Sequence, residues 1–193
     1  MMDTKKLILA SGSPRRREIL ESAGYIFTVI TPDADEVMEG ALPEDLATEN
    51  SRLKALAATK MTDGVIICAD TVVALEDKIL GKPKDSEDAE AMLRSLSEKT
   101  HSVITGYTVT DGEKFICGHT KTDVTMRRIH DDEIRAYVAS GSPLDKAGAY
   151  GIQEAAGMFV SKINGDYYNV VGLPVSTISE ILRNEFDICA FMK

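Results

Sequence analysis

The feature that most limits the fold of this chain is an uninterrupted apolar run near its middle, from Val65 to Ala69. A strand with one face in water alternates apolar and polar residues, whereas a strand covered on both faces can be apolar throughout. The run therefore predicts a strand inside a sheet that is covered on both sides. Strand-like and helix-like segments alternate along the chain, so we expect an α/β fold.

Periodicity and capping signals predict the other elements, with Ser13, Asp85 and Asp131 as the expected caps of three helices. Strands are expected at residues 6–10, 25–30, 65–75, 102–110, 114–128, 158–163 and 167–171, and helices at 14–23, 43–60, 85–96, 131–139 and from Pro174. Asp111-Gly112 and Asn164-Gly165 are strong signals for tight hairpin turns. Two hairpins predict a mixed central sheet flanked by helices. The absence of a Gly-x-Gly-x-x-Gly motif also argues against a doubly wound dinucleotide-binding fold.

Length and charge narrow the class of protein. A chain of 193 residues suits one domain, or one domain with two lobes around a cleft. No apolar run approaches the roughly 20 residues that span a bilayer, and the start of the sequence shows no signal-peptide pattern. The net charge of −9 would repel a long nucleic-acid backbone, whereas a small anion needs only a few cations in one pocket. We expect a cytoplasmic protein without a membrane or nucleic-acid partner.

The cysteines and histidines form no recognisable site. The three cysteines are odd in number and far apart, which argues against a disulfide framework or a zinc site and favours buried or semi-buried thiols in a reducing cytosol. The three histidines lack metal-ligand spacing and are expected to be structural or exposed. These residues are Cys68, Cys117, Cys189, His101, His119 and His130. No Gly-x-Ser-x-Gly elbow occurs either.

The first candidate for chemistry is the turn between the first strand and the first helix, residues 11–17. Free backbone N–H groups at a helix start attract anions, and Gly12 would let a phosphate approach the backbone closely. Ser11 offers a hydroxyl, and Arg15 and Arg16 offer charge-assisted bonds to phosphate oxygens. The alternative is a capped helix with solvated arginines. Cations oppose the helix dipole at this end, so the pattern favours an anion site.

The second candidate is Asp70, which directly follows the apolar run. A carboxylate there would be costly if it were buried without a partner. At the carboxyl end of a central strand it would point into a cleft, where α/β proteins commonly bind ligands. It could then bind a divalent metal or activate water. The alternative is an aspartate that caps a turn.

Two further segments have the residue types that a phosphate enzyme needs. Lys82, beside Pro83, could place a cation over a polyphosphate, although a solvated turn explains the same residues. The acidic loop contains Asp33, Asp35, Glu36 and Glu39. Such loops are usually solvated, yet carboxylates also supply the hard oxygen ligands that magnesium prefers.

Together these segments resemble the Maf family, also called septum formation inhibitors. The matching blocks are Leu9–Arg16, Asp35-Glu36, Lys54-Ala55, Ala69–Val72, Gly81–Pro83, Asp145–Gln153, Ile163–Tyr168 and Val171–Pro174. They occur in the family's order over nearly the whole chain. Ser51 is a small departure, because the family often has alanine there. The resemblance implies one Maf-like domain over residues 1–193 with a fold akin to that of the inosine triphosphate pyrophosphatases.

The resemblance also implies an activity. The family contains nucleoside triphosphate pyrophosphatases that are commonly homodimers and use a divalent cation, magnesium or manganese. The form of the 11–16 turn is similar to the dTTP/UTP branch rather than the 7-methyl-GTP branch. The alternative is a nucleotide-binding regulator of cell division without significant catalysis. Such a regulator would not need Asp70 and Glu36 together, and both are present.

Roles follow for individual positions of this sequence. Asp70 resembles the family's proton acceptor, and Glu36 resembles an acidic residue near the metal or the attacking water. Both are therefore expected to be metal ligands and, with Lys82, catalytic residues. The residues similar to the polyphosphate-binding set are Ser11, Arg15, Arg16, Lys54 and Lys82. Those similar to the base-specificity set are Arg15, Thr71 and Gln153.

Overall fold

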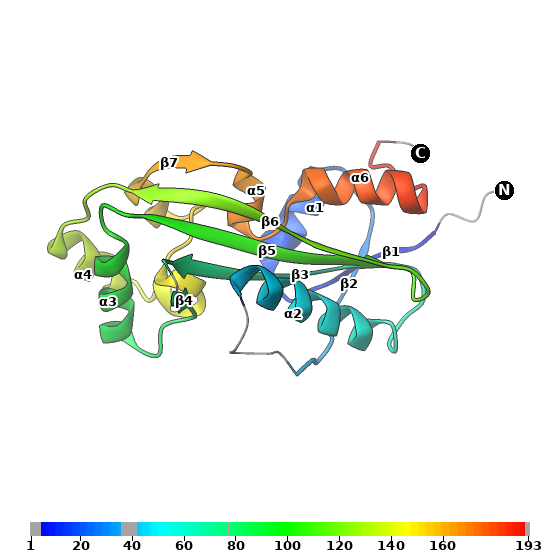
Figure 1. Cartoon of the computed structure of the whole chain (residues 1–193), viewed down its shortest axis with the longest axis horizontal. Helices are drawn as coiled ribbons and strands as arrows, with labels where there is room; N and C mark the ends of the chain where they lie inside the picture. The colour runs from blue at the N-terminus through cyan, green and yellow to red at the C-terminus, as the bar shows by residue number, and fades with distance from the viewer. Residues whose placement is uncertain (1–4, 36–41, 77, 192–193) are drawn as a thin grey trace. The chain divides into compact units, whose positions relative to one another are not determined.

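The computed structural model describes residues 5–35, 42–76 and 78–191 (Figure 1). The strands are β1 (Leu7–Ala10), β2 (Thr28–Ile30), β3 (Val65–Leu75), β4 (Lys78–Leu80), β5 (Thr100–Thr110), β6 (Phe115–Met126) and β7 (Val160–Asn164). The helices are α1 (Pro14–Ser22), α2 (Pro43–Ala58), α3 (Ser86–Leu96), α4 (Asp131–Ala139), α5 (Tyr167–Val171) and α6 (Val175–Phe186), with short 3-10 turns η1 (Ser142–Asp145), η2 (Ala147–Ala149) and η3 (Ala155–Phe159). Within those ranges, no helix has the length and apolar character needed to cross a membrane.

The strands form one mixed sheet. Its order is β2-β1-β3-β5-β6-β7, and β4 pairs with β3 beside this path. β1 is parallel to both β2 and β3, with Leu9 opposite Val29 and Ile67. β4 is antiparallel to β3, and β7 is antiparallel to β6. The predicted α/β class with a mixed sheet is confirmed.

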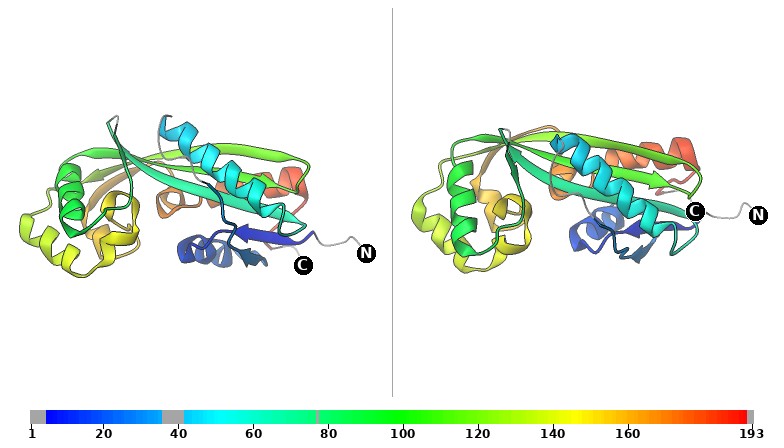
Figure 2. Two further views of the ribbon diagram at one scale, coloured as in Figure 1. Left: turned by 90° about the horizontal axis from the view of Figure 1, so that it is seen from below. Right: turned by 60° about the horizontal axis from the view of Figure 1, so that its bottom comes forward.

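The chain divides into two compact units, and β3, β5 and β6 contribute residues to both. Unit 1 contains Met1–Asp70, Thr105–Thr120 and Gly172–Lys193, and unit 2 contains Thr71–Ile104 and Lys121–Val171. In unit 1, α2 covers one face of the strands, and α1 and α6 cover the other (Figures 1 and 2).

Helix α2 rests directly on β5. A Cβ atom at Gly106 would lie 2.1 Å from the carbonyl carbon of Ala47, so only glycine permits this approach. The hydroxyl groups of Ser51 and Thr108 are hydrogen-bonded at 2.8 Å between the same two elements. Ser51 is completely buried, so the hydroxyl at this departure from the family pattern has a partner.

The apolar run behaves as its sequence predicts. Val65, Ile67 and Ala69 are at most 1% exposed, and so are the two residues between them. The strand continues through Asp70 to Leu75, as predicted, so Asp70 lies within β3 and not at its carboxyl end. The physical reason is that the carboxylate of Asp70 finds partners on α2, so the strand need not stop where the first charge appears.

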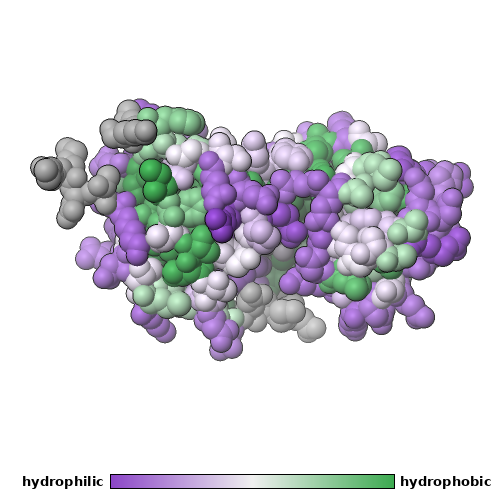
Figure 3. Space-filling view, turned by 180° about the vertical axis from the view of Figure 1, so that it is seen from behind, coloured by the Kyte–Doolittle hydropathy of each residue, from purple (hydrophilic) through white to green (hydrophobic). Residues whose placement is uncertain are grey.

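Apolar side chains reach the surface of unit 1 near the edge strand β2. Figure 3 shows green side chains on the part of unit 1 where this strand lies. Ile26 is 90% exposed and Val29 is 43% exposed. β2 has only three residues, and a short edge strand limits unwanted pairing with other chains.

Unit 2 is built around α3 and α4. The carboxylate of Asp85 accepts a bond from the N–H of Asp88 at 2.9 Å, which confirms the predicted cap of α3. Ala89, Leu93 and Leu96 are completely buried, as their helical spacing predicts. The predicted cap at Asp131 is off by one residue, because His130 precedes the first turn of α4.

The predicted strand at residues 167–171 is wrong, because this segment is helix α5. The Asp166 carboxylate accepts the N–H of Tyr168 at 2.7 Å, which favours a helical turn over a strand. Asn169 is buried and donates to the carbonyl oxygen of Val103 and the hydroxyl oxygen of Thr122, both at 2.9 Å. The Asn164-Gly165 turn therefore leads from β7 into a helix rather than into a second hairpin strand.

The six cysteines and histidines divide by environment. Cys68 is buried, Cys189 is half-buried, and all three thiols are free. Cys117 is exposed, which corrects the expectation that every thiol is at least partly buried. His119 and His130 are exposed, whereas His101 is 2% exposed and bonds through Nε2 to the Tyr150 hydroxyl at 2.7 Å.

This buried histidine should make stability depend on pH. Burial lowers the pKa of His101 from 6.5 to about 4, although the charge of Asp123 opposes the shift. The unfolded chain therefore takes up this proton at a higher pH than the folded protein. Stability should fall as the pH drops from 6.5 towards 4, by up to about 1.4 kcal/mol per pH unit. Urea unfolding of wild type and His101→Gln across this window checks it, and an equally steep dependence in the variant contradicts it.

Candidate functional site

In unit 1, candidate residues gather where two neighbouring parallel strands leave the apolar core. Ser11 directly follows β1, and Asp70 lies three residues beyond Ile67, the β3 partner of Leu9. Because residues advance about 3.3 Å each along parallel strands, Ser11 and Asp70 lie near the same end of this strand pair. The sheet therefore brings the first and second sequence candidates to one edge.

The turn after β1 is ordered by its own side chains. Ser13 precedes Pro14 at the start of α1, as predicted, but its side chain makes no capping bond. Instead, the hydroxyl oxygen of Ser11 accepts the N–H of Ser13 at 3.3 Å. The guanidinium of Arg16 donates to the same oxygen at 3.1 Å. The serine hydroxyl thus fixes the entry into the helix.

Arg16 links this turn to a distant part of the chain in unit 1. Its Nε donates to the carbonyl oxygen of Gly172 at 2.8 Å, just before α6. The first turn of α1 has no acidic residue and contains Arg15, Arg16 and Arg17. Arg17 pairs with Glu21 at 2.7 Å on the exposed face, so its charge is locally balanced. The helix start therefore combines oriented N–H groups with arginine charge, which suits an anion.

Asp70 is held by helix α2. Its Oδ1 accepts the ammonium of Lys54 at 2.7 Å, and its Oδ2 accepts the amide of Asn50 at 3.4 Å. The side chains of Lys54 and Asp70 are 17% and 14% exposed, so water can still reach the pair. A charge-assisted bond of this kind fixes the carboxylate in position.

The electrostatics of a buried thiol on β3 reflect two nearby cations. Burial raises the pKa of Cys68 to about 12, while the positive charges of Lys54 and Arg16 act in the opposite direction. Both cations are therefore near enough to act on the same side chain, two residues before Asp70. The Cys68 thiol stays protonated and is not a nucleophile.

Sequence reasoning missed Asn50. This residue is 3% exposed, and its amide contacts the Asp70 carboxylate. The available signal is spacing, because Asn50 lies four residues before Lys54 in a segment with helical periodicity. Residues so spaced lie on one face of a helix, so a polar residue there would be expected to share the partner of Lys54.

The candidates of unit 2 lie on β3 and two loops. Thr71 is half-buried within β3, and Lys82 is exposed just after β4. The carbonyl oxygen of Gly81 accepts the N–H of Gly148 at 3.0 Å. The loop that carries Lys82 is therefore attached to the segment that leads to Gln153. Gln153 itself is exposed between η2 and η3.

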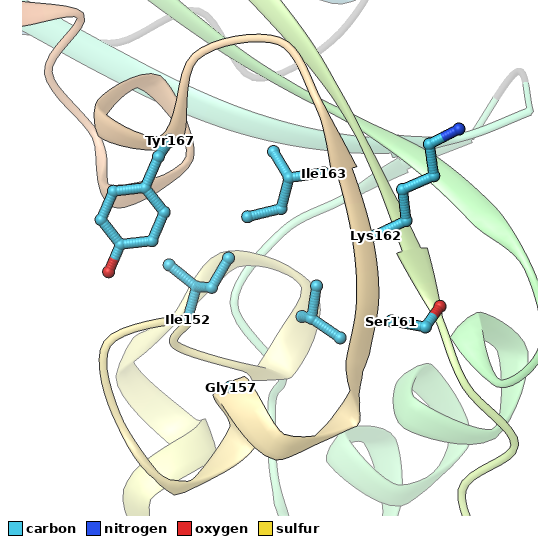
Figure 4. A pocket seen from close by; sticks show the side chains of 7 residues that line it. Ile152, Gly157, Ser161, Lys162, Ile163 and Tyr167 are labelled. Atoms are coloured by element: carbon cyan, nitrogen blue, oxygen red, sulfur yellow. The ribbon is translucent and has the colours of Figure 1, made fainter.

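A hollow of about 300 Å³ is lined in part by Ile152, the residue that precedes Gln153 in the sequence. It is lined by Ile152, Gly157, Val160, Ser161, Lys162, Ile163 and Tyr167. In Figure 4 the side chains of Ile152, Ile163 and Tyr167 face the hollow, whereas Ser161 and Lys162 point away from it. Its walls are therefore largely apolar and do not suit a phosphate group.

The predicted acidic residue Glu36 lies outside the described residues, as does Glu39. Asp33 and Asp35 are exposed. Within residues 5–35, 42–76 and 78–191, no group of three histidine, cysteine, aspartate or glutamate side chains could hold a metal ion. The carboxylate that unit 1 places beside the arginine turn is that of Asp70.

Comparison with known proteins identifies relatives along almost the whole sequence. The family model described as Maf-like protein matches residues 6–185. A protein from Thermococcus gammatolerans is 46% identical over 94% of this chain and 98% of its own length. Proteins from Alkaliphilus metalliredigens and Geotalea uraniireducens are 47% and 48% identical over 95% of this chain and 98% and 97% of their own lengths. All three relatives are named dTTP/UTP pyrophosphatase.

A solved structure shares the fold. A HAM1 protein from Coxiella burnetii superposes with a TM-score of 0.53 over 93% of this chain and 98% of its own chain. The two sequences are only 16% identical, so the likeness concerns the mixed α/β architecture alone.

Proposed function

The chain belongs to the Maf family, and from that premise we propose that it is a dTTP/UTP pyrophosphatase. It cuts a pyrimidine nucleoside triphosphate into the nucleoside monophosphate and pyrophosphate. The observation that carries the proposal is the 46–48% identity, over nearly full length, to relatives with that name. The geometry of unit 1 supports it, because an arginine-rich helix start follows β1 and a hydrogen-bonded carboxylate lies on the neighbouring strand β3.

Phosphate binding falls to the cationic residues. A triphosphate carries several negative charges, which must be neutralised before a nucleophile can approach. The backbone N–H groups at the start of α1 and the side chains of Ser11, Arg15 and Arg16 would bind phosphate oxygens. Lys82, exposed on its loop, would bind the β- and γ-phosphates. Arg16 also orders the turn, so its guanidinium is held in a fixed position.

Asp70 would act on the attacking water. Its carboxylate pairs with the Lys54 ammonium at 2.7 Å. A bound phosphate offers Lys54 a second anionic partner, and this lessens the hold on the carboxylate. Asp70 then accepts a proton as a water oxygen bonds to the α-phosphorus and the bond to the bridging oxygen breaks. Pyrophosphate leaves with its new charge neutralised by the arginine and lysine side chains.

A divalent cation fits this arrangement. Magnesium is commonly held by one or two carboxylates together with substrate phosphate oxygens and water, so Asp70 needs few protein partners for it. We assign Asp70 and Glu36 as the residues that would hold magnesium or manganese. The cation would neutralise phosphate charge and increase the acidity of bound water.

Further properties complete the proposal. We propose that residues 1–193 form one Maf-like domain, since three strands supply residues to both units. The protein is a homodimer, as the resemblance implies, and sedimentation equilibrium measures this directly. Its setting is the cytoplasm, which agrees with three free thiols. Nucleic acid and membranes are not among its partners.

The products test the reaction. Attack at the α-phosphorus gives the nucleoside monophosphate and pyrophosphate. Ion chromatography after incubation of dTTP or UTP with magnesium should show these two products in equal amounts, without added pyrophosphatase. Release of orthophosphate and a nucleoside diphosphate would overturn the assignment, and the absence of any product would favour a binding protein.

Asp70→Asn should abolish most of the turnover while leaving the fold intact. The change keeps the shape of the side chain but removes its charge and basicity, so we expect a loss of at least ~100-fold in kcat. Lys54 is partly exposed, so water can reach its ammonium in the variant. Asp63→Asn, at an exposed position in unit 1, serves as the matched control. A kcat within a factor of about two of wild type in Asp70→Asn would exclude the catalytic role.

Gln153→Ala should reduce the preference for pyrimidines. The amide of Gln153 has both a donor and an acceptor, as required to read the edge of uracil or thymine. A site that leaves its polar groups unpaired on the wrong base discriminates strongly. We expect wild type to prefer dTTP and UTP over dATP and GTP in kcat/KM, and the variant to lose much of that ratio. An unchanged ratio means that Gln153 does not read the base, and a wild-type preference for GTP or 7-methyl-GTP contradicts the branch assignment.

A further inference from the structure

Unit 2 contains a buried lysine that the proposed mechanism does not use. The side chain of Lys146 is 6% exposed, and lysine is rarely buried without partners. Its ammonium donates to the carbonyl oxygen of Ser142 at 2.6 Å and to the Asp145 carboxylate at 2.7 Å. It also pairs with the Glu154 carboxylate at 3.2 Å. This one group therefore joins the segment before it to the residue that follows Gln153.

The stem of Lys146 lies against the backbone of the same turn. A Cβ atom at Gly151 would come within 2.9 Å of Lys146 Cε and 3.0 Å of its Cδ. The N–H of Glu154 donates to the carbonyl oxygen of Gly151 at 3.1 Å and closes the turn over residues 151–154. Lys146 thus contacts both ends of the turn that contains Gln153, through its stem at one end and its charge at the other.

The backbone between Lys146 and this turn is fixed as well. Gly148 and Ala149 have left-handed φ values of 70° and 61°, and such a value is uncommon for alanine. The N–H of Ala149 bonds to the carbonyl oxygen of Lys146 at 3.1 Å, and the Tyr150 hydroxyl bonds to His101. These contacts hold residues 148–151 in one conformation. A strained residue persists only where its surroundings hold it, and here they do.

We propose that Lys146 is a positioning residue for base selection, which holds the 151–154 turn so that Gln153 is presented to the nucleobase in one geometry. The inference rests on the proposed function, in which Gln153 reads the base. Lys146 acts through that turn and does not itself contact the nucleotide. Its contacts differ from those of the surface lysines, because both its stem and its ammonium are committed to one short segment.

The ammonium can be removed without leaving a buried charge. The side chains of Asp145 and Glu154 are 70% and 38% exposed, so both carboxylates can be hydrated when the lysine is gone. Methionine has an unbranched apolar stem of similar length and can occupy the space beside Gly151. Burial alone would lower the pKa of Lys146, but the bonds and charges of Asp145 and Glu154 raise it above its ordinary value. Lys146→Met therefore removes a charge that is present at neutral pH.

The test compares discrimination rather than activity alone. The ratio of kcat/KM for dTTP to that for dATP is measured for wild type, Lys146→Met and Glu154→Gln. Displacing a positioned group by a small distance costs on the order of 10- to 100-fold, so we expect the ratio to fall about 10-fold in Lys146→Met. Glu154→Gln weakens one contact of the ammonium and should lower the ratio less. Lys99→Met is the matched control, because Lys99 pairs with Glu76 at 3.5 Å on the surface of the same unit.

A double variant decides whether Lys146 acts through Gln153. If it does, Lys146→Met should lower the ratio little further in a Gln153→Ala background. The inference is overturned if the effects of Lys146→Met and Gln153→Ala on the ratio multiply in the double variant. It is also overturned if Lys146→Met and Glu154→Gln both keep the wild-type ratio. In either case, a lowered ratio in Gln153→Ala leaves the proposed function standing. A wild-type ratio in Gln153→Ala overturns base reading by this residue and the inference with it. Faster amide exchange at residues 151–154 in Lys146→Met than in Lys99→Met is also expected, and equal exchange overturns the inference.

Discussion

The ion pair between Lys54 and Asp70 is the contact on which the candidate site of unit 1 depends. A carboxylate directly after a fully buried stretch of β3 needs a partner, and α2 supplies one from Lys54 and another from Asn50. These contacts join α2 to β3, and the bare backbone at Gly106 allows α2 to lie directly on β5. Both partners are polar, and Asp70 itself is partly exposed near the edge where β1 ends. The same contacts thus provide hydrogen-bond partners for a carboxylate on β3 and hold that carboxylate in position at the candidate site.

The two cations near this carboxylate, Arg16 and Lys54, have different roles. The planar guanidinium of Arg16 donates hydrogen bonds to the Ser11 hydroxyl and the Gly172 carbonyl oxygen, and it keeps its full charge while it does so. Lys54 is a compact charge on a flexible stem, and its ammonium donates to an oxygen of the Asp70 carboxylate. A bound phosphate can therefore draw Lys54 away more easily than it can rearrange Arg16. Arg16 therefore orders the site, and Lys54 can change its partner when a phosphate binds.

Much of this was open to prediction from the sequence. The buried strand at Val65–Ala69, the start of α1 at Pro14 and the Asp85 cap depend on neighbouring residues, so local pattern suffices for them. Ordered blocks along the chain also identified the family, which the match over residues 6–185 bears out. The wrong predictions of secondary structure arose where contacts with distant residues determine the local conformation. Residues 167–171 form a helix because the Asp166 carboxylate and the partners of Asn169 favour it over their strand-like composition.

The sequence by itself determined the α/β class, the family and the residue types that a polyphosphate site requires. Only the tertiary structure decided which of these residues meet. It places Lys54 on Asp70 across 16 residues of chain and Arg16 on Gly172 across 156. It also adds Asn50, and it attaches the Lys82 loop to the segment that leads to Gln153. The physical reason is that hydrophobic pattern and turn chemistry act over a few residues, whereas the partner of a charge is whatever the packed sheet and helices bring beside it.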